Sequence, residues 1–166
     1  SSFLPALRDG RLDFAIGTLS AEMQLQDLHV EPLFESEFVV VASKSRTCTS
    51  TLSLESLSNE QWVLPQTDMG YYKELLNTLH LHHINTENIV KTDSVVTIYN
   101  LVLNAGFLTV IPKDMIAPFG SDQFIILPVE DYLPVARYAA IWSKNYRIKK
   151  SASVLVDLAK KYSSRN

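Results

Sequence analysis

The order of apolar and polar residues predicts strands that alternate with helices along the chain. Short apolar runs bounded by glycine, proline or polar residues indicate strands, and apolar residues three and four positions apart indicate helices. In the clearest helix, Tyr72, Leu75, Leu76 and Leu79 share one face. The pattern predicts strands over 12–17, 33–43, 62–65, 89–92, 108–111, 124–129 and 136–143, one helical turn over 54–57, helices over 3–9, 70–82 and 94–105, and a closing helix from residue 151.

Residues at the helix boundaries support these assignments. Ser2 and Ser94 are placed to cap the first and third helices, and Gly10 and Gly106 to end them. Thr67 or Asp68 is expected to cap the second helix. The closing helix is predicted to bury one side, made by Val154, Leu155, Leu158 and Tyr162.

Alternating strands and helices of this length are typical of an α/β fold with mainly parallel sheets. The extended segments 33–43 and 134–143 are longer than their neighbours, which suggests two crossover strands between two lobes. The chain opens in a helix, so we expect the first strand of one lobe to be missing from it.

Composition narrows the function. The 166 residues include 46% hydrophobic and 20% charged residues, which suits a soluble domain with a sizeable core. A formal net charge of −3 is unlike a module that grips a phosphate backbone. Cys48 is the single cysteine, so no internal disulfide is possible, and we expect it to be an idle surface residue. No apolar run approaches a membrane span.

Several motifs resemble the LysR-type transcription regulators. The stretch 7–17 (LRDGRLDFAIG) is similar to the helix end and strand of their sensing domains, and 31–41 (EPLFESEFVVV) to their first crossover strand. The order of the remaining elements matches as well. The stretch 89–104 (IVKTDSVVTIYNLVLN) is similar to members that activate operons for threonine and serine breakdown. One departure is Phe107, because the family often has a glycine in its place.

The resemblance implies a two-lobed, periplasmic-binding-protein-like (type II) fold that lacks its first strand–helix–strand. Residues 1–38 and 137–166 would form lobe I, and residues 39–136 lobe II. It also implies a small-molecule effector in the cleft, a winged helix-turn-helix outside this chain that contacts DNA, a homodimer or homotetramer, and a cytoplasmic location. The helices over 3–9 and 94–105 are candidate subunit contacts because both carry more apolar residues than one buried face requires, and a two-sided contact within the core is the alternative. No cofactor and no membrane contact are expected.

In such folds ligands sit at the carboxyl ends of strands and at helix N-termini, where free N–H groups favour anions. The positions in this chain that meet the condition, and that we predict to bind the effector, are Thr18, Gln66, Thr67, Asp93 and Ser94. Their side chains and amides suit a small polar ligand, such as an amino acid or another carboxylate. The plainer alternative is that Thr67, Asp93 and Ser94 only cap helices.

Other classes of function have weaker support. His80, His82 and His83 are adjacent at a helix end, so we expect a solvated terminus rather than a metal site. No motif of a hydrolase, metalloprotease or phosphate-binding loop is present, so no catalytic residue is predicted. A transport-type solute-binding protein and a two-lobed enzyme remain the alternatives. In the enzyme, a substitution of Asp93 should abolish turnover.

Overall fold

The structure is a computed structural model that describes residues 3–19, 23–66, 70–116 and 122–163, with backbone only at 70, 162 and 163. The chain divides into two compact units, which are described separately. Unit 1 comprises Ser1–Ser36, Asp68–Tyr71 and Ala136–Asn166, and unit 2 comprises Glu37–Thr67 and Tyr72–Val135. No described helix has the length and apolar character to span a bilayer.

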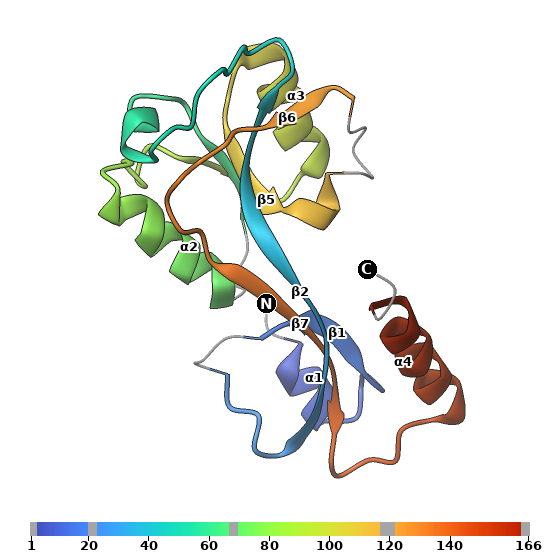
Figure 1. The fold of residues 1–166 in the computed structure, drawn as a ribbon. Coiled ribbons are helices and arrows are strands. Elements are labelled where there is room, and N and C mark those ends of the chain that lie inside the picture. Colours follow the sequence, from blue (N-terminus) through green and yellow to red (C-terminus); the bar gives the residue numbers. More distant parts are fainter. Residues whose placement is uncertain (1–2, 20–22, 67–69, 117–121, 164–166) are drawn as a thin grey trace. The chain divides into compact units, whose positions relative to one another are not determined.

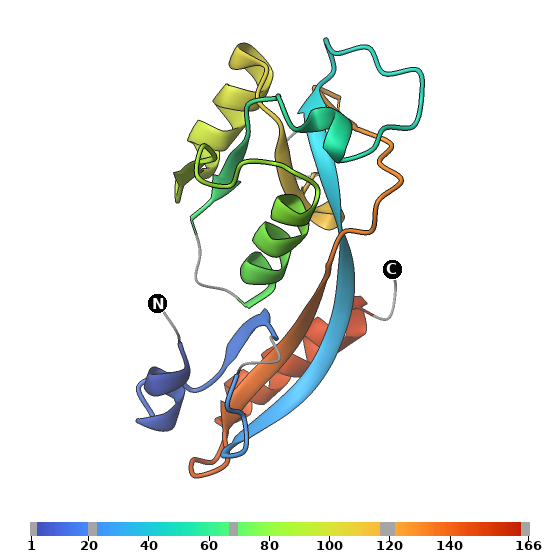
Figure 2. The same cartoon turned by 90° about the vertical axis from the view of Figure 1, so that its left-hand side faces the viewer.

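Unit 1 is built around strands with a helix on each side (Figures 1 and 2). The strand order is β1-β7-β2, so β7 lies in the middle, and β1 pairs with β7 in antiparallel fashion. α1 and α4 cover opposite faces of these strands. The bounds are α1 (Leu4–Arg8), β1 (Ala15–Thr18), β2 (Leu28–Ser43), β7 (Val135–Ser143) and α4 (Lys150–Ser163).

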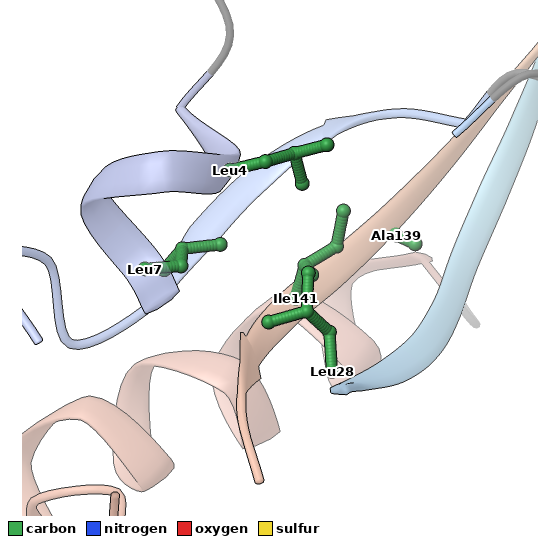
Figure 3. Close-up of a cluster of buried hydrophobic side chains, with 5 residues drawn as sticks. All are labelled: Leu4, Leu7, Leu28, Ala139 and Ile141. Carbon is green, nitrogen blue, oxygen red and sulfur yellow. The ribbon is translucent and has the colours of Figure 1, made fainter. Parts of the chain in front are cut away.

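The core of unit 1 lies between α1 and the sheet. Figure 3 shows Leu4 and Leu7 of α1 directed toward Ile141 of β7 and Leu28 of β2. Leu7 and Ile141 are fully buried. Gly17 of β1 faces the same side, since a Cβ atom added there would lie 2.9 Å from Cε1 of Phe3. The absence of a side chain at this position therefore lets the start of α1 pack on the strand.

The first helix is also tied to the chain that follows it. The Arg8 guanidinium donates to the Asp27 carboxylate, at 2.7 Å from Nε, and to the carbonyl oxygen of Gln24, also at 2.7 Å. The hydrogen bond from Arg8 lowers the pKa of the Asp27 carboxyl below its ordinary value. Gly10 has a left-handed backbone (φ +69°), which suits the residue that follows the end of the helix.

Unit 2 contains the later part of β2 and the chain between the two long strands except for Asp68–Tyr71. β5 and β6 pair with β2 in antiparallel fashion, and β3 pairs with β4 in parallel fashion. A parallel bridge between Trp62 and Leu108 links this pair to the start of β5. The elements are the 3-10 turn η1 (Glu55–Leu57), β3 (Val63–Pro65), α2 (Gly70–Leu81), β4 (Val90–Thr92), α3 (Val95–Ala105), β5 (Thr109–Pro112), the 3-10 turn η2 (Lys113–Met115) and β6 (Phe124–Ile126).

One side of α3 packs on β3 and forms part of the core of unit 2. Val63, Ile98 and Val102 are buried together. Phe107, the residue that departs from the family pattern, packs against this cluster as a half-buried side chain. The bulky ring is thus used in packing at the end of α3.

The predicted mixed α/β fold is confirmed, and the helices 70–82 and 94–105 agree with α2 and α3 to within one or two residues. Three expectations about strands were wrong. The first strand is Ala15–Thr18 rather than 12–17, the strand predicted at 124–129 ends at Ile126, and β2 begins at Leu28 rather than 33. The prediction of mainly parallel sheets was also wrong. Among the strand pairs described above, only β3–β4 is parallel.

Two helix expectations also need correction. Ser2 lies outside the described residues, and the N-cap position of α1 is Phe3, which makes no side-chain capping bond. In α4 the buried apolar residues are Ala152 and Val156, whereas Val154, Leu155 and Leu158 are about half exposed and the Tyr162 side chain lies outside the described set. The stripe predicted to be buried therefore faces away from the core of unit 1.

We expect Leu7→Ala to lower the free energy of unfolding by about 2–5 kcal/mol, because it leaves a cavity in the α1 core. Leu81→Ala is the matched control, since Leu81 is 76% exposed and Leu7 is 0% exposed. It should change stability by less than about 0.5 kcal/mol. Urea unfolding of both variants measures the difference, and equal effects would contradict the packing described.

Candidate functional site

The candidate site lies in unit 2, where β3 and β4 end side by side. The register pairs Leu64 with Lys91 and Pro65 with Thr92. Because the two strands are parallel, their carboxyl ends meet at the same edge. The Gln66 N–H donates to the Thr92 carbonyl at 2.8 Å, which extends the pairing by one residue. Gln66, Asp93 and Ser94 are therefore brought together.

Ser94 is the N-cap of α3, as predicted. Its backbone is extended (φ −88°, ψ 105°), and its Oγ accepts the N–H of Thr97 at 3.2 Å. Its own N–H donates to the Thr92 Oγ1 at 3.1 Å. At the other end of α3, Gly106 has the left-handed conformation (φ 74°) and closes the helix. Local side-chain chemistry thus fixes where this helix begins and ends.

The capping pattern leaves two amides of the first turn for a ligand. Helix geometry gives the first N–H groups of α3 no partner within the helix. The Ser94 hydroxyl accepts the N–H of Thr97, and within the described part of the chain the N–H groups of Val95 and Val96 have no hydrogen-bond partner. Both residues are exposed, with 45% and 69% of their surface accessible. The helix dipole adds about 0.3–1 kcal/mol in favour of negative charge at this point.

Charged side chains near the strand ends have opposite signs. Asp93 is exposed and lies directly before the N-cap, where the helix dipole stabilises its negative charge. Lys91 is exposed on β4, two residues earlier. An anionic ligand at the α3 N-terminus therefore competes with Asp93 for the same end of the helix.

The other predicted positions are placed differently. Thr67, together with its neighbour Asp68, lies outside the described residues. Thr18 is the last residue of β1 in unit 1, where it pairs with Tyr138 and is 2% exposed. It is thus a strand residue with a buried side chain, and not the first loop residue after the strand.

Tyr72 is a candidate that sequence reasoning treated only as part of an apolar face. Its side chain is 8% exposed, and its hydroxyl has no hydrogen-bond partner in the described part of the chain. Burial raises the pKa of this phenol. Tyr72 lies at the start of α2, the helix that follows β3. Periodicity predicted its burial, but no sequence signal shows that a hydroxyl lacks a partner.

The histidines belong to the end of α2, as expected. His82 Nδ1 lies 3.6 Å from the Asp131 carboxylate, and His83 Nε2 lies 3.9 Å from that of Glu55. His83 itself has a left-handed backbone (φ 62°) just after the helix. Across the described ranges, no group of three or more potential ligands is arranged to hold a metal ion.

The sequence shows which family this is: the chain belongs to the LysR substrate binding domain family, whose model matches residues 1–164. It is 81% identical over all 166 residues to the HTH-type transcriptional regulator TdcA of Escherichia coli K12. The chain spans about half of that relative's length (53%).

Solved structures share the fold. The regulatory domain of Synechocystis PCC6803 CcmR, in complex with 2-PG, matches with a TM-score of 0.78 at 14% identity, over 97% of this chain and 78% of that one. The effector binding domain of QuiR, in complex with shikimate, matches with a TM-score of 0.74 at 17% identity, over 99% of this chain and 78% of that one. The fold is thus that of LysR effector-binding domains.

We expect Ser94→Ala to lower the free energy of unfolding by about 0.5–2 kcal/mol, because Thr97 loses its acceptor. Ser94→Asp should keep stability close to that of the unmodified chain, since aspartate is an equally good N-cap. Chemical denaturation of the two variants tests the cap. A loss as large for aspartate as for alanine would show that capping is not what Ser94 contributes.

Tyr72→Phe should keep or raise stability, by up to about 1–3 kcal/mol, because it removes a buried hydroxyl that lacks a partner. A raised pKa in the folded state favours the neutral phenol. The unfolded chain therefore loses this proton first, and stability falls as pH rises past the ordinary tyrosine pKa of about 10.

The phenylalanine variant lacks that loss, so its advantage over the unmodified chain should grow above that pH. Unfolding at neutral and alkaline pH measures this difference, while other titrating groups cancel between the two proteins. A constant difference would argue against a perturbed Tyr72.

Proposed function

We propose that this chain is the effector-sensing and oligomerisation domain of a LysR-type, DNA-binding transcription regulator. The observation that carries the proposal is the edge where β3 and β4 end, with the open first turn of α3 beside Gln66 and Asp93. The family membership and the 81% identity to TdcA support it. The regulator would activate an operon for threonine or serine breakdown and would contact DNA through a winged helix-turn-helix outside this chain.

The proposed ligand is a small carboxylate, which includes amino acids and keto acids. The N–H groups of Val95 and Val96 would receive its carboxylate, and the Gln66 amide and Ser94 hydroxyl would add polar contacts. Thr18, Thr67 and Asp93 remain proposed contributors. Three or four such hydrogen bonds, each contributing about 0.5–1.5 kcal/mol, suit a sensor with metabolite-range affinity.

The proposed sensor has two lobes, lobe I formed by residues 1–38 and 137–166 and lobe II by residues 39–136. These bounds lie within two residues of those of the two units, except at Asp68–Tyr71. Binding would bias their arrangement by about 1–3 kcal/mol, which is enough to change how the regulator engages DNA. Solved domains with this fold were captured with small molecules, 2-PG in CcmR and shikimate in QuiR.

We also propose that α3 contributes to contacts between subunits of a homodimer or homotetramer. Val95 and Val96 are exposed apolar residues on this helix, while its Ile98 and Val102 are buried. The other helix considered, α1, uses Leu4 and Leu7 in the core of unit 1. The structure therefore gives no support for a second apolar face on α1 that would contact another subunit.

An enzymatic role is less well supported than sensing. The proposed regulator is cytoplasmic and binds its effector without turnover, and membership of the LysR substrate binding domain family supports a binding role. A transport protein would share the fold, but the similarity to a transcription regulator covers the whole chain.

Thermal-shift measurements with L-threonine, L-serine and short 2-keto acids test the proposal. A ligand at 100 times its dissociation constant should add about 2.7 kcal/mol of stability. Ser94→Asp separates binding from capping, because it retains a cap but places a negative charge beside the proposed carboxylate. It should remove the shift while leaving unliganded stability intact.

Stabilisation of Ser94→Asp equal to that of the unmodified protein would restrict Ser94 to its capping role. No stabilisation by any of these compounds would count against the proposed ligand class. Conversion of a compound during incubation would favour the enzyme instead.

A further inference from the structure

The loop that joins β7 to α4 concentrates positive charge. Residues 144–150 (KNYRIKK) include four cationic side chains and no carboxylate, so this segment has a formal charge of +4. The whole chain has a formal charge of −3, and the remaining residues together therefore carry −7. We call residues 144–150 the basic loop. The net charge of the chain thus conceals one strongly basic segment.

The cations of the basic loop are largely uncompensated. All four are exposed: Lys144, Arg147, Lys149 and Lys150. Lys149 pairs with Asp13 at 3.0 Å. Lys144 donates to a backbone carbonyl oxygen at 2.8 Å, and that carbonyl carries no formal charge. Within the described part of the chain, Arg147 and Lys150 form no ion pair. The loop therefore keeps most of its positive charge available to a partner.

Two of these cations lie where they do not favour the helix that follows. α4 begins at Lys150 and has no acidic residue in its first turn, and the Lys149 carbonyl accepts the N–H of Ser153 at 3.0 Å. Both lysines are thus at the positive end of the helix dipole, where carboxylates are the stabilising residues. Helix stability alone would favour acidic or small polar residues here. These cations suit the binding of an anion better than they suit the start of α4.

The basic loop is held against the rest of unit 1. The Tyr146 ring lies against Gly10, since a Cβ atom added to Gly10 would lie 3.1 Å from Cζ of the tyrosine. The Lys144 N–H donates to the Asp27 carbonyl oxygen at 3.1 Å. Figures 1 and 2 show the loop between β7 and α4 at one end of unit 1. Its cations are therefore presented together from a backbone with a defined path.

We propose that the basic loop contacts the phosphate backbone of DNA and does so without reading the base sequence. The inference goes beyond the proposed function and rests on it only for the presence of DNA beside this domain. The contact would add to that of the helix-turn-helix outside this chain. Lysine and arginine side chains that neutralise phosphates release bound counterions, and this release supplies affinity for DNA of any sequence.

The composition of the basic loop favours phosphates over an acidic protein surface. Stable protein interfaces have an apolar core within a polar rim. Among residues 144–150, Tyr146 is the one large apolar side chain that is exposed, at 53%. Contacts to phosphate need charge and hydrogen-bond donors rather than apolar area. The loop supplies the former and little of the latter.

Binding of the 166-residue chain to a short DNA duplex of arbitrary sequence tests the proposal. We expect binding by fluorescence anisotropy at low salt, with a logarithmic salt slope of about −0.9 per phosphate contact. Arg147→Gln combined with Lys150→Gln should weaken binding at low salt by at least about tenfold and reduce the slope by about 2. Lys44→Gln combined with Lys113→Gln is the matched control, because it removes two exposed cations of unit 2. It should change the affinity by less than about twofold.

Stability measurements separate binding from folding. The urea midpoint of Lys150→Gln should be unchanged or higher, because a cation leaves the positive end of the α4 dipole. A clearly lower midpoint would assign the cation to the fold itself and overturn the proposal.

Poly-L-glutamate represents the other class of partner. Tighter binding to this polymer than to DNA, compared at equal concentrations of negative charge, would assign the basic loop to an acidic protein surface and overturn the proposal. Equal weakening of DNA binding by both pairs of substitutions would reduce the effect to net charge, and no DNA binding at low salt would leave nothing to explain; either result overturns it. None of these measurements needs an effector, so their failure is distinct from a failure to find a ligand.

Discussion

The fold depends on one long strand that supplies hydrogen-bonding edges to both units. β2 runs for 16 residues; its first part, to Ser36, belongs to unit 1, and its remainder to unit 2. Val40, Val41 and Ala42 are 1–2% exposed. Buried backbone groups must be paired, and β5 and β6 provide those partners from either side of the same stretch. Without them, the most apolar part of the chain would carry unsatisfied N–H and C=O groups into the core.

The position of the candidate site depends on that strand through a series of strand pairings. β2 aligns β5, with Val41 opposite Thr109. The residue before Thr109 is Leu108, whose carbonyl accepts the N–H of Val63 at 2.9 Å and so places β3. β3 in turn sets the register of β4, and hence the position of Ser94 and the first turn of α3. The polar edge at Gln66, Asp93 and Ser94 is therefore positioned by a series of strand pairings that starts at the buried part of β2.

How far the sequence predicts this arrangement depends on whether the determinants are local. The ends of α3 follow from Ser94 and Gly106, each of which acts within a few residues, and both were predicted. Strand orientation depends on partners far along the chain, so the antiparallel pairing of β1 with β7 could not be anticipated from strand–helix alternation. For the site, parallel pairing brings together Gln66, Asp93 and Ser94 as expected, whereas Thr18 is a buried strand residue. The Tyr72 hydroxyl has no partner among the described residues, which depends on its surroundings in three dimensions and has no local signal in the sequence.

The closing helix shows why helical periodicity alone does not identify a core. The spacing of apolar residues in the sequence finds the side with the larger apolar residues, here Val154, Leu155 and Leu158, but it does not tell which side meets the chain's own sheet. The sheet instead meets Ala152 and Val156, whose small side chains allow a helix to approach closely. Burial of apolar surface contributes about 25 cal/mol per Å². Covering these half-exposed aliphatic side chains would therefore add stabilising free energy beyond that of the described contacts of α4.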